Sequence, residues 1–355
     1  MQNQTKKRIL VAPLNWGLGH ATRCIPLIHA LLENEFEPVI ASDGIALKLL
    51  EKEFPQLKAI ELPSYNIVYP KKAQFFKLKL LKNSPKLIQT IKAESKHTKS
   101  IIIDYGIDGI ISDNRLGVFS KSIPSVFMTH QLKVLSGNTT WLSSKMHQKI
   151  IKQFDECWIP DNCGEENLSG DLGHVNMIDI PIKYIGPLSR LKKTNIKNKY
   201  DLMVLLSGPE PQRTLLQNSL LKKLKNYKGD VLFVKGIIDD ESKVFVNGHM
   251  TIYNFMTSKT LEKAMNESKA VLSRSGYTTI MDLAKLEKKA FFIPTPGQYE
   301  QKYLAKRLTE LGLVASCNQK DFTIEMLETI DNYKGLKSTD DFTNYKKLFS
   351  LFQSK

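Results

Sequence analysis

The sequence predicts an α/β protein made of two doubly wound domains that face each other across a cleft. Short apolar segments alternate with stretches of helical periodicity in both halves of the chain, which is typical of parallel sheets covered by helices. Glycine-containing turns follow several of these apolar segments, and the carboxyl ends of parallel strands form the ligand crevice of such sheets. At 355 residues the chain is long enough for two domains.

The composition favours a partner that carries negative charge. The formal net charge is +15, because 51 Lys and Arg residues outnumber 36 Asp and Glu residues. A nucleotide, an acidic membrane surface or a nucleic acid would each suit this charge. The basic residues carry no nucleic-acid-binding signature, so a non-catalytic basic binding protein is only an alternative. The amino-terminal residues contain no long apolar segment, and we expect a cytoplasmic protein.

The first strand-to-helix junction contains a candidate catalytic histidine. The apolar residues 8–13 lead into the turn at residues 15–19, where Gly17 and Gly19 would let a ligand approach the backbone. His20 follows at the start of a helix, where the helix dipole lowers the pKa of an imidazole. A neutral imidazole can act as a general base. A purely structural hydrogen-bonding role for His20 is the alternative.

Two more strands of the amino-terminal half, at residues 107–112 and 125–128, end in polar residues that should converge on the cleft near His20. These polar residues are Asp113, Asn114, Arg115, His130 and Gln131. Asp113 is the second candidate base, because it could polarise an acceptor hydroxyl or orient a base. A structural salt bridge between Arg115 and Asp113 is the alternative.

A lysine-rich segment, residues 71–99, is a candidate contact with an anionic membrane surface. Residues 69–99 contain nine lysines and one acidic residue, with apolar side chains between them. Such a segment can place apolar side chains in a membrane interface and lysines toward the headgroups, which would make the protein peripheral at the inner face of the cell membrane. A pair of packed helices with solvated lysines is the alternative.

The chain is expected to divide at a Lys/Asn-rich linker, residues 187–200, after a Gly-Pro pair. The predicted domains are residues 1–186 and 201–335. Residues 336–355 would form a terminal helix that could cross back to the first domain.

Three turns of the second domain suit a nucleotide diphosphate carrying a sugar. The turns after residues 205 and 272 supply glycines and arginines for phosphates, and the loop PTPGQYEQ supplies groups that read sugar hydroxyls. A carboxylate further along the helix could bind a ribose. The candidate donor-binding residues are Ser207, Gly208, Arg213, Arg274, Ser275, Gly276, Thr279, Asp282, Gln298, Glu300 and Gln301.

The segments RSGYTTIMDLA and PTPGQYEQKYLA resemble the donor-binding half of glycosyltransferase family 28, and the Gly-x-Gly-His at residues 17–20 resembles its amino-terminal loop. Asp282 is shorter than the Glu usual in that family, and two prolines after Gly208 replace part of a glycine-rich cradle. The resemblance implies the GT-B architecture of two Rossmann-like domains. It also implies inverting transfer of N-acetylglucosamine or a similar sugar, from a UDP-linked or other nucleotide-diphosphate donor, to a lipid-linked or cell-envelope glycan acceptor.

The motif from Gly17 to Cys24 is equally similar to nucleotide-sugar hydrolases of sialic-acid-like sugar biosynthesis, in which water replaces the acceptor. Beyond the nucleotide sugar, we expect no cofactor. The turn GLGHAT lacks the third glycine of the NAD fingerprint, and four scattered cysteines predict neither disulfides nor zinc. Asp239-Asp240 reads as solvated surface rather than a metal motif, so we expect a metal-independent enzyme.

Overall fold

The computed structural model of the chain describes residues 6–65, 76–175, 179–208, 210–237, 239, 241–337 and 343–353, and for residues 76–85 only the backbone. Of these residues, the first compact unit (unit 1) contains 6–65, 77–188 and 343–353. The second (unit 2) contains residue 76 and residues 189–337.

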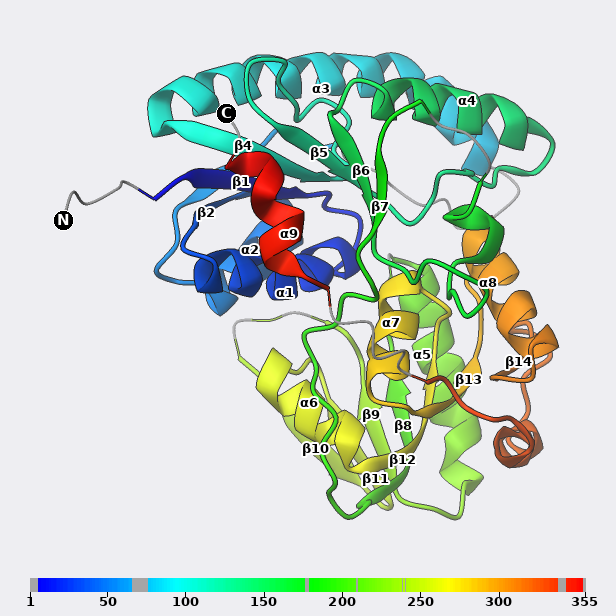
Figure 1. Ribbon diagram of the computed structural model, residues 1–355. Coiled ribbons are helices and arrows are strands. Elements are labelled where there is room, and N and C mark those ends of the chain that lie inside the picture. The colour runs from blue at the N-terminus through cyan, green and yellow to red at the C-terminus, as the bar shows by residue number, and fades with distance from the viewer. Residues whose placement is uncertain are drawn as a thin grey trace. The chain divides into compact units, whose positions relative to one another are not determined.

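Unit 1 contains a parallel sheet of seven strands in the order β3-β2-β1-β4-β5-β6-β7 (Figure 1). The strand order reverses at β1 and β4, and helices α1 and α2 cover the face opposite α3 and α4, as right-handed crossovers require. The strands are β1 (Arg8–Pro13), β2 (Glu37–Ser42), β3 (Ala59–Glu61), β4 (Ile107–Asp113), β5 (Ser125–Met128), β6 (Glu156–Ile159) and β7 (Ile182–Tyr184). The helices are α1 (Gly19–Glu33), α2 (Gly44–Glu53), α3 (Phe76–Tyr105), α4 (Thr140–Ile151) and α9 (Tyr345–Leu348), with short 3-10 turns η2 (Gly137–Thr139), η3 (Gly170–Leu172) and η6 (Phe349–Phe352).

Unit 2 repeats this plan with the strand order β10-β11-β9-β8-β12-β13-β14, in which only the hairpin strand β10 runs antiparallel to its neighbour. Its strands are β8 (Tyr200–Leu205), β9 (Val231–Val234), β10 (Val244–Asn247), β11 (Met250–Tyr253), β12 (Ser268–Ser273), β13 (Lys289–Phe292) and β14 (Ala315–Ser316). Its helices are α5 (Gln212–Lys223), α6 (Ser258–Asn266), α7 (Tyr277–Lys285) and α8 (Tyr299–Glu310), with the 3-10 segments η4 (Leu224–Asn226) and η5 (Glu325–Asn332).

The carboxyl-terminal residues complete the core of unit 1. Phe349 and Phe352 are fully buried, and their rings lie 5.7 and 6.3 Å from the ring of Phe36. Trp158 on β6 packs against the same two phenylalanines. The last turns of the chain therefore help to hold the amino-terminal sheet.

The predicted pair of doubly wound α/β sheets is confirmed. The helix pair expected by the alternative for residues 71–99 is wrong, because one helix, α3, runs from Phe76 to Tyr105. The solvated lysines of that alternative agree with the structure where side chains are described, since Lys86, Lys92, Lys96 and Lys99 are exposed. Residues 71–75 and the side chains of residues 76–85 lie outside the described part, so the membrane contact of this segment stays a prediction. None of the helices within the described residues is long and apolar enough to cross a membrane.

Candidate active site

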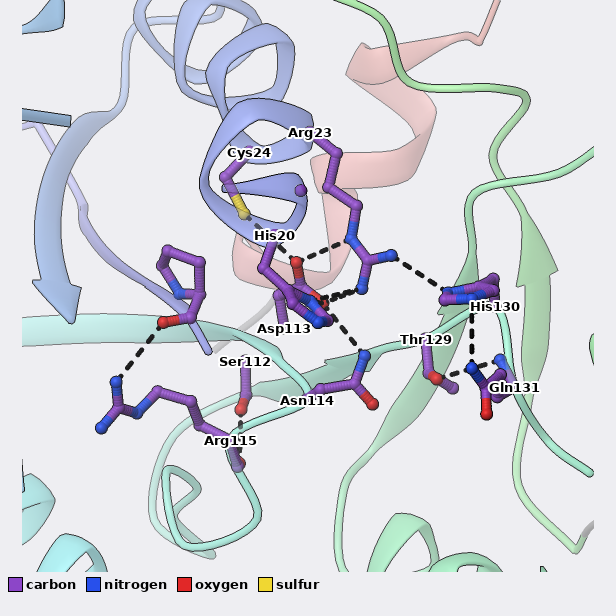
Figure 2. A network of polar contacts seen from close by, with 12 residues as sticks. His20, Arg23, Cys24, Ser112, Asp113, Asn114, Arg115, Thr129, His130 and Gln131 are labelled. Carbon is purple, nitrogen blue, oxygen red and sulfur yellow. Dashed lines mark hydrogen bonds and ion pairs between the residues drawn. The ribbon is translucent and has the colours of Figure 1, made fainter. Parts of the chain in front are cut away.

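The candidate catalytic residues His20 and Asp113 meet at the carboxyl edge of the unit 1 sheet (Figure 2). Asp113 is the last residue of β4 and pairs in register with Pro13, the last residue of β1. Helix α1 begins only six residues after Pro13, so His20 in its first turn lies close to the end of β4. The Nδ1 atom of His20 is 3.0 Å from Oδ1 of Asp113. The Asp113 side chain is fully buried, whereas 14% of the His20 side chain is exposed.

Arg23, which sequence reasoning did not single out, joins these two residues (Figure 2). Its Nε donates to Oδ2 of Asp113 at 2.7 Å, and a terminal NH2 group donates to Oδ1 of the same carboxylate. Nδ1 of His20 lies 2.9 Å from that NH2 group, and Nδ1 of His130 lies 3.1 Å from the other. The available signal was the spacing: Arg23 follows His20 by three residues and therefore shares its face of α1.

Burial and neighbouring charges set the protonation states of His20 and Asp113. Burial lowers the pKa of His20, Asp113 opposes this effect, and the positive charge of Arg23 adds to it, so the pKa lies below its usual value. Burial alone would raise the pKa of Asp113, but Arg23 and His20 outweigh burial and hold that pKa well below its usual range. At neutral pH the pair is therefore a carboxylate beside an uncharged imidazole.

Arg115 does not belong to this cluster. Its Nε donates to Glu94 at 2.6 Å, and its NH1 group donates to Asp43 at 2.7 Å. The alternative of a salt bridge between Arg115 and Asp113 is therefore wrong. The fully buried Arg115 instead ties α3 to the loop after β2, because both acidic partners lie on those segments.

The other predicted cleft residues lie around the pair. Asn114 adopts a φ of 57° and donates from Nδ2 to Asp113 at 3.3 Å. His130, beyond the end of β5, is buried against Arg23. Gly17 has a φ of 76°, and a Cβ there would meet no described atom within 4 Å, so the turn before α1 is open to a ligand. Gly19 is the first residue of α1.

Two open glycines lie at the carboxyl edge of the unit 2 sheet. Strands β8 and β12 are neighbours, with Leu205 paired to Ser273, so the turns that follow them share one edge. A Cβ at Gly208 would meet no described atom within 4 Å, and one at Gly276 would meet only the Thr279 hydroxyl, at 4.0 Å. Gly276 is the N-cap of α7, whose first N–H groups can bind a phosphate.

Three other predicted donor residues hold loops together. Arg274 is 1% exposed and donates to the carbonyl oxygens of Ile293, Pro294 and Gln212 and to the Gln319 side chain. Ser275 donates to the carbonyl of Gln301, and the Gln301 side chain accepts from the N–H of Thr295 at 2.7 Å. Arg274 and Ser275 lie in the predicted turn after β12, and Gln301 lies in the first turn of α8, but their polar groups are directed into the protein.

The remaining donor candidates differ in exposure. Asp282 is 8% exposed and accepts from the Ser189 hydroxyl at 2.6 Å, and burial raises its pKa to about 6. Arg213 is ion-paired with Glu210. The half-buried candidates are Ser207 after β8, Thr279 in the first turn of α7, Gln298 at the N-cap of α8 and Glu300 in the first turn of α8.

Within the described ranges, no group of three or more His, Cys, Asp or Glu side chains could hold a metal ion. Asp240 lies outside those ranges, so the surface role expected for Asp239-Asp240 stays a prediction.

Comparison with known proteins finds a matching family model and several relatives named as glycosyltransferases. Residues 213–347 match the Glycosyltransferase family 28 C-terminal domain. An uncharacterized glycosyltransferase of Methanopyrus kandleri is 23% identical over 84% of this chain and 86% of its own length. The UDP-N-acetylglucosamine–N-acetylmuramyl-(pentapeptide) pyrophosphoryl-undecaprenol N-acetylglucosamine transferase of Buchnera aphidicola is 27% identical over 69% of this chain and 67% of its own length.

Solved structures show the same fold at low identity. Acinetobacter baumannii MurG aligns with a TM-score of 0.57 at 12% identity, covering 99% of this chain and 100% of its own. The spinosyn forosaminyltransferase SpnP aligns with a TM-score of 0.62 at 10% identity, covering 99% and 96%. The family model and the relatives show that the chain is a glycosyltransferase, and the solved structures show the GT-B fold. Residues 213–347 match the family 28 C-terminal domain, so the predicted resemblance to that family is confirmed.

Proposed function

We propose that the protein is an inverting, metal-independent transferase that moves N-acetylglucosamine or a similar sugar from a UDP-linked donor to a hydroxyl of a lipid-linked or cell-envelope glycan acceptor. The observation that carries this proposal is the His20–Asp113 pair, with Nδ1 and Oδ1 3.0 Å apart. The Buchnera relative, by its name, transfers N-acetylglucosamine from UDP-N-acetylglucosamine to an undecaprenol-linked acceptor.

The chemistry assigns one role to each side chain. Nε2 of His20 takes the proton of the acceptor hydroxyl while the hydroxyl oxygen bonds to the anomeric carbon. The bond between that carbon and the diphosphate breaks, and the diphosphate leaves with the electron pair. Asp113 stays ionised, holds the imidazole by Nδ1 and stabilises the imidazolium that forms.

Unit 2 would hold the donor. The N–H groups at the start of α7, behind Gly276, would bind the diphosphate and stabilise its charge as it leaves, a role that other transferases give to a metal ion. Asp282 would accept a ribose hydroxyl, and Gln298 and Glu300 would contact the sugar. Arg274 would support this site by holding the loop that ends at Gln298, through the carbonyls of Ile293 and Pro294.

The test is nucleotide release from a panel of UDP-, GDP- and dTDP-sugars, with and without bacterial lipid extract and with and without EDTA. Release that needs lipid, survives EDTA and is lost in His20→Ala supports the transferase. Release without lipid would instead identify the nucleotide-sugar hydrolase, in which the same base activates water. A requirement for Mg²⁺ or Mn²⁺ would contradict the proposed mechanism.

An exposed apolar patch on α4 supports a membrane-bound acceptor. Trp141, Leu142 and Met146 are 67%, 51% and 62% exposed, and Nζ of Lys145 lies 4.4 Å from the centroid of the Trp141 ring. No acidic residue occurs between Asp113 and Asp155. Trp at an interface with lysines toward anionic headgroups is the pattern of peripheral binding.

Sedimentation with vesicles tests this contact. We expect the protein to bind vesicles of phosphatidylglycerol and phosphatidylcholine but not of phosphatidylcholine alone, and Trp141→Ala to weaken that binding. Equal binding by the wild type and the Trp141→Ala variant would remove α4 from the proposal and leave residues 71–99 as the candidate.

A further inference from the structure

We propose that Arg23 is a positioning residue that holds Asp113 as a fixed carboxylate and thereby sets the tautomer and the charge of His20. The role in catalysis rests on the proposed function, but the arrangement itself does not. Arg23 is 1% exposed, and both oxygens of Asp113 accept from its guanidinium. This bidentate geometry fixes the plane of the carboxylate as well as its charge.

The tautomer of His20 depends on which of two neighbours forms a hydrogen bond with its Nδ1 atom. Nδ1 of His20 lies 3.0 Å from Oδ1 of Asp113 and 2.9 Å from a terminal nitrogen of Arg23. Arginine can only donate hydrogen bonds. If Nδ1 lacks a proton, it accepts from Arg23, and the proton sits on Nε2, which then cannot act as a base. If Nδ1 carries the proton, it donates to Asp113, and Nε2 keeps the lone pair that abstracts the acceptor proton.

Asp113 wins this competition because its carboxylate can only accept. Both possible hydrogen bonds are charge-assisted, but an unprotonated Nδ1 would turn its lone pair toward the anionic Oδ1 only 3.0 Å away, and that repulsion is removed when Nδ1 carries the proton. Arg23 does not need Nδ1 as an acceptor, because its Nε and one terminal nitrogen donate to Asp113 and the other terminal nitrogen faces His130. The arrangement therefore selects the Nδ1–H tautomer of His20, which leaves Nε2 as the base.

Arg23 also opposes a second proton on the ring. The charged or titratable groups that face His20 are Asp113 from β4, Arg23 from α1 and His130 from the loop after β5. The thiol of Cys24 contacts the other side of Asp113, with Sγ 3.7 Å from Oδ2. Asp113 favours the imidazolium and Arg23 disfavours it. Removing Arg23 would leave Asp113 unopposed, and His20 would be protonated more readily.

The test needs no substrate. Long-range 15N–1H spectra of the full chain labelled at histidine, with His20 assigned through His20→Gln, report the tautomer and the pKa of this ring. We expect the wild type to show the Nδ1–H tautomer and a pKa below that of ordinary histidine. In Arg23→Gln we expect the pKa of His20 to rise toward that of ordinary histidine, because the opposing positive charge is gone. Arg23→Lys keeps the charge but not the guanidinium that donates to both carboxylate oxygens, so the pKa of His20 should rise less in this variant.

Arg115→Lys is the matched control. Arg115 is another fully buried arginine of unit 1 and pairs with Asp43 and Glu94, so its replacement should lower the melting temperature without moving the pKa of His20. A wild-type His20 protonated on Nε2 would overturn the proposal even if both Arg23 variants misfold. So would an unchanged His20 pKa in folded Arg23→Gln. If the spectra agree with expectation but no sugar nucleotide is cleaved, the proposed function fails and the role of Arg23 in the pair stands.

Discussion

The two candidate sites use charged side chains in opposite ways. In unit 1, Arg23, His20 and Asp113 are directed toward one another, and together they set a protonation state. In unit 2, the buried charges of Arg274 and Asp282 bind loop carbonyls and the Ser189 hydroxyl, while Gly208 and Gly276 leave backbone open to a ligand.

This difference follows from the two tasks. Proton transfer needs one group whose pKa is tuned by its neighbours, which requires charges at short, fixed distances. A diphosphate spreads its negative charge over many oxygens. It is best bound by several backbone N–H groups that the helix already holds in the right orientation, so that binding needs no reorganisation. We therefore expect substitutions in the His20–Asp113–Arg23 cluster to change chemistry, and those at the candidate donor site of unit 2 to change stability or affinity.

Loss of the base should have the largest effect. We expect His20→Ala to lower the turnover number by about 10²- to 10⁴-fold, because a positioned general base contributes that much, with donor affinity unchanged. Initial rates and UDP titration calorimetry measure the two quantities. His174→Ala is the control, because His174 is another histidine of unit 1 that contacts a buried carboxylate, with Nε2 3.3 Å from Asp161. Turnover of His20→Ala within a few-fold of wild type would exclude His20 as the base.

Loss of Arg274 should have the second-largest effect. Arg274→Met would leave three buried carbonyls and the half-buried Gln319 side chain without their donor, and we expect a loss of roughly 3–5 kcal/mol in the free energy of unfolding. Urea denaturation measures it. In Arg213→Met the loss should be smaller, because Arg213 pairs with the mostly exposed Glu210. Loss of UDP binding in Arg274→Met at unchanged stability would instead mean that Arg274 contacts the diphosphate directly.

His20 and Arg274 also show what could and could not be predicted from the sequence. Apolar runs and glycine turns predicted the strands and placed His20 and Asp113 at adjacent strand ends, because parallel topology brings carboxyl ends together. Turn chemistry placed Arg274 in the correct loop but could not tell that its guanidinium turns inward, since that depends on carbonyls as distant as Gln212. Arg115 was misjudged for the same reason: its acidic partners lie 72 and 21 residues away.

The raised pKa of Asp282 predicts a pH-dependent stability. Burial raises this pKa to about 6 from 3.8, so the folded protein binds the proton more tightly than the unfolded chain. The contribution of Asp282 to stability therefore falls as pH rises from about 4 to about 6 and stays low above that range. Asp282→Asn cannot ionise, so its stability relative to wild type should rise by about 2–3 kcal/mol over this window. Denaturation of both proteins at several pH values measures it, and a constant difference would show that the Ser189 hydroxyl and Arg190 hold the pKa at its ordinary value.

The smallest expected effect is also the sharpest test of a site built from backbone. Gly276 has a φ of −72°, which alanine adopts freely, and the new methyl group would stand in open space 4.0 Å from the Thr279 hydroxyl. We expect Gly276→Ala to fold with a modest loss of stability, because alanine is a poorer N-cap than glycine. It should bind UDP about tenfold more weakly, a loss of about 1.4 kcal/mol, because the methyl occupies the space where a phosphate would approach the N–H groups of α7.

Thr257→Ala provides the matched control for Gly276→Ala. Thr257 is the N-cap of α6, which like α7 has nine residues, and it has the same φ of −72°. Both substitutions place alanine at a helix N-cap of unit 2, so both should cost similar stability. Only Gly276→Ala should weaken UDP binding. If both variants bind UDP as wild type does, the diphosphate does not approach α7, and the turn at Gly208 would remain as the phosphate site.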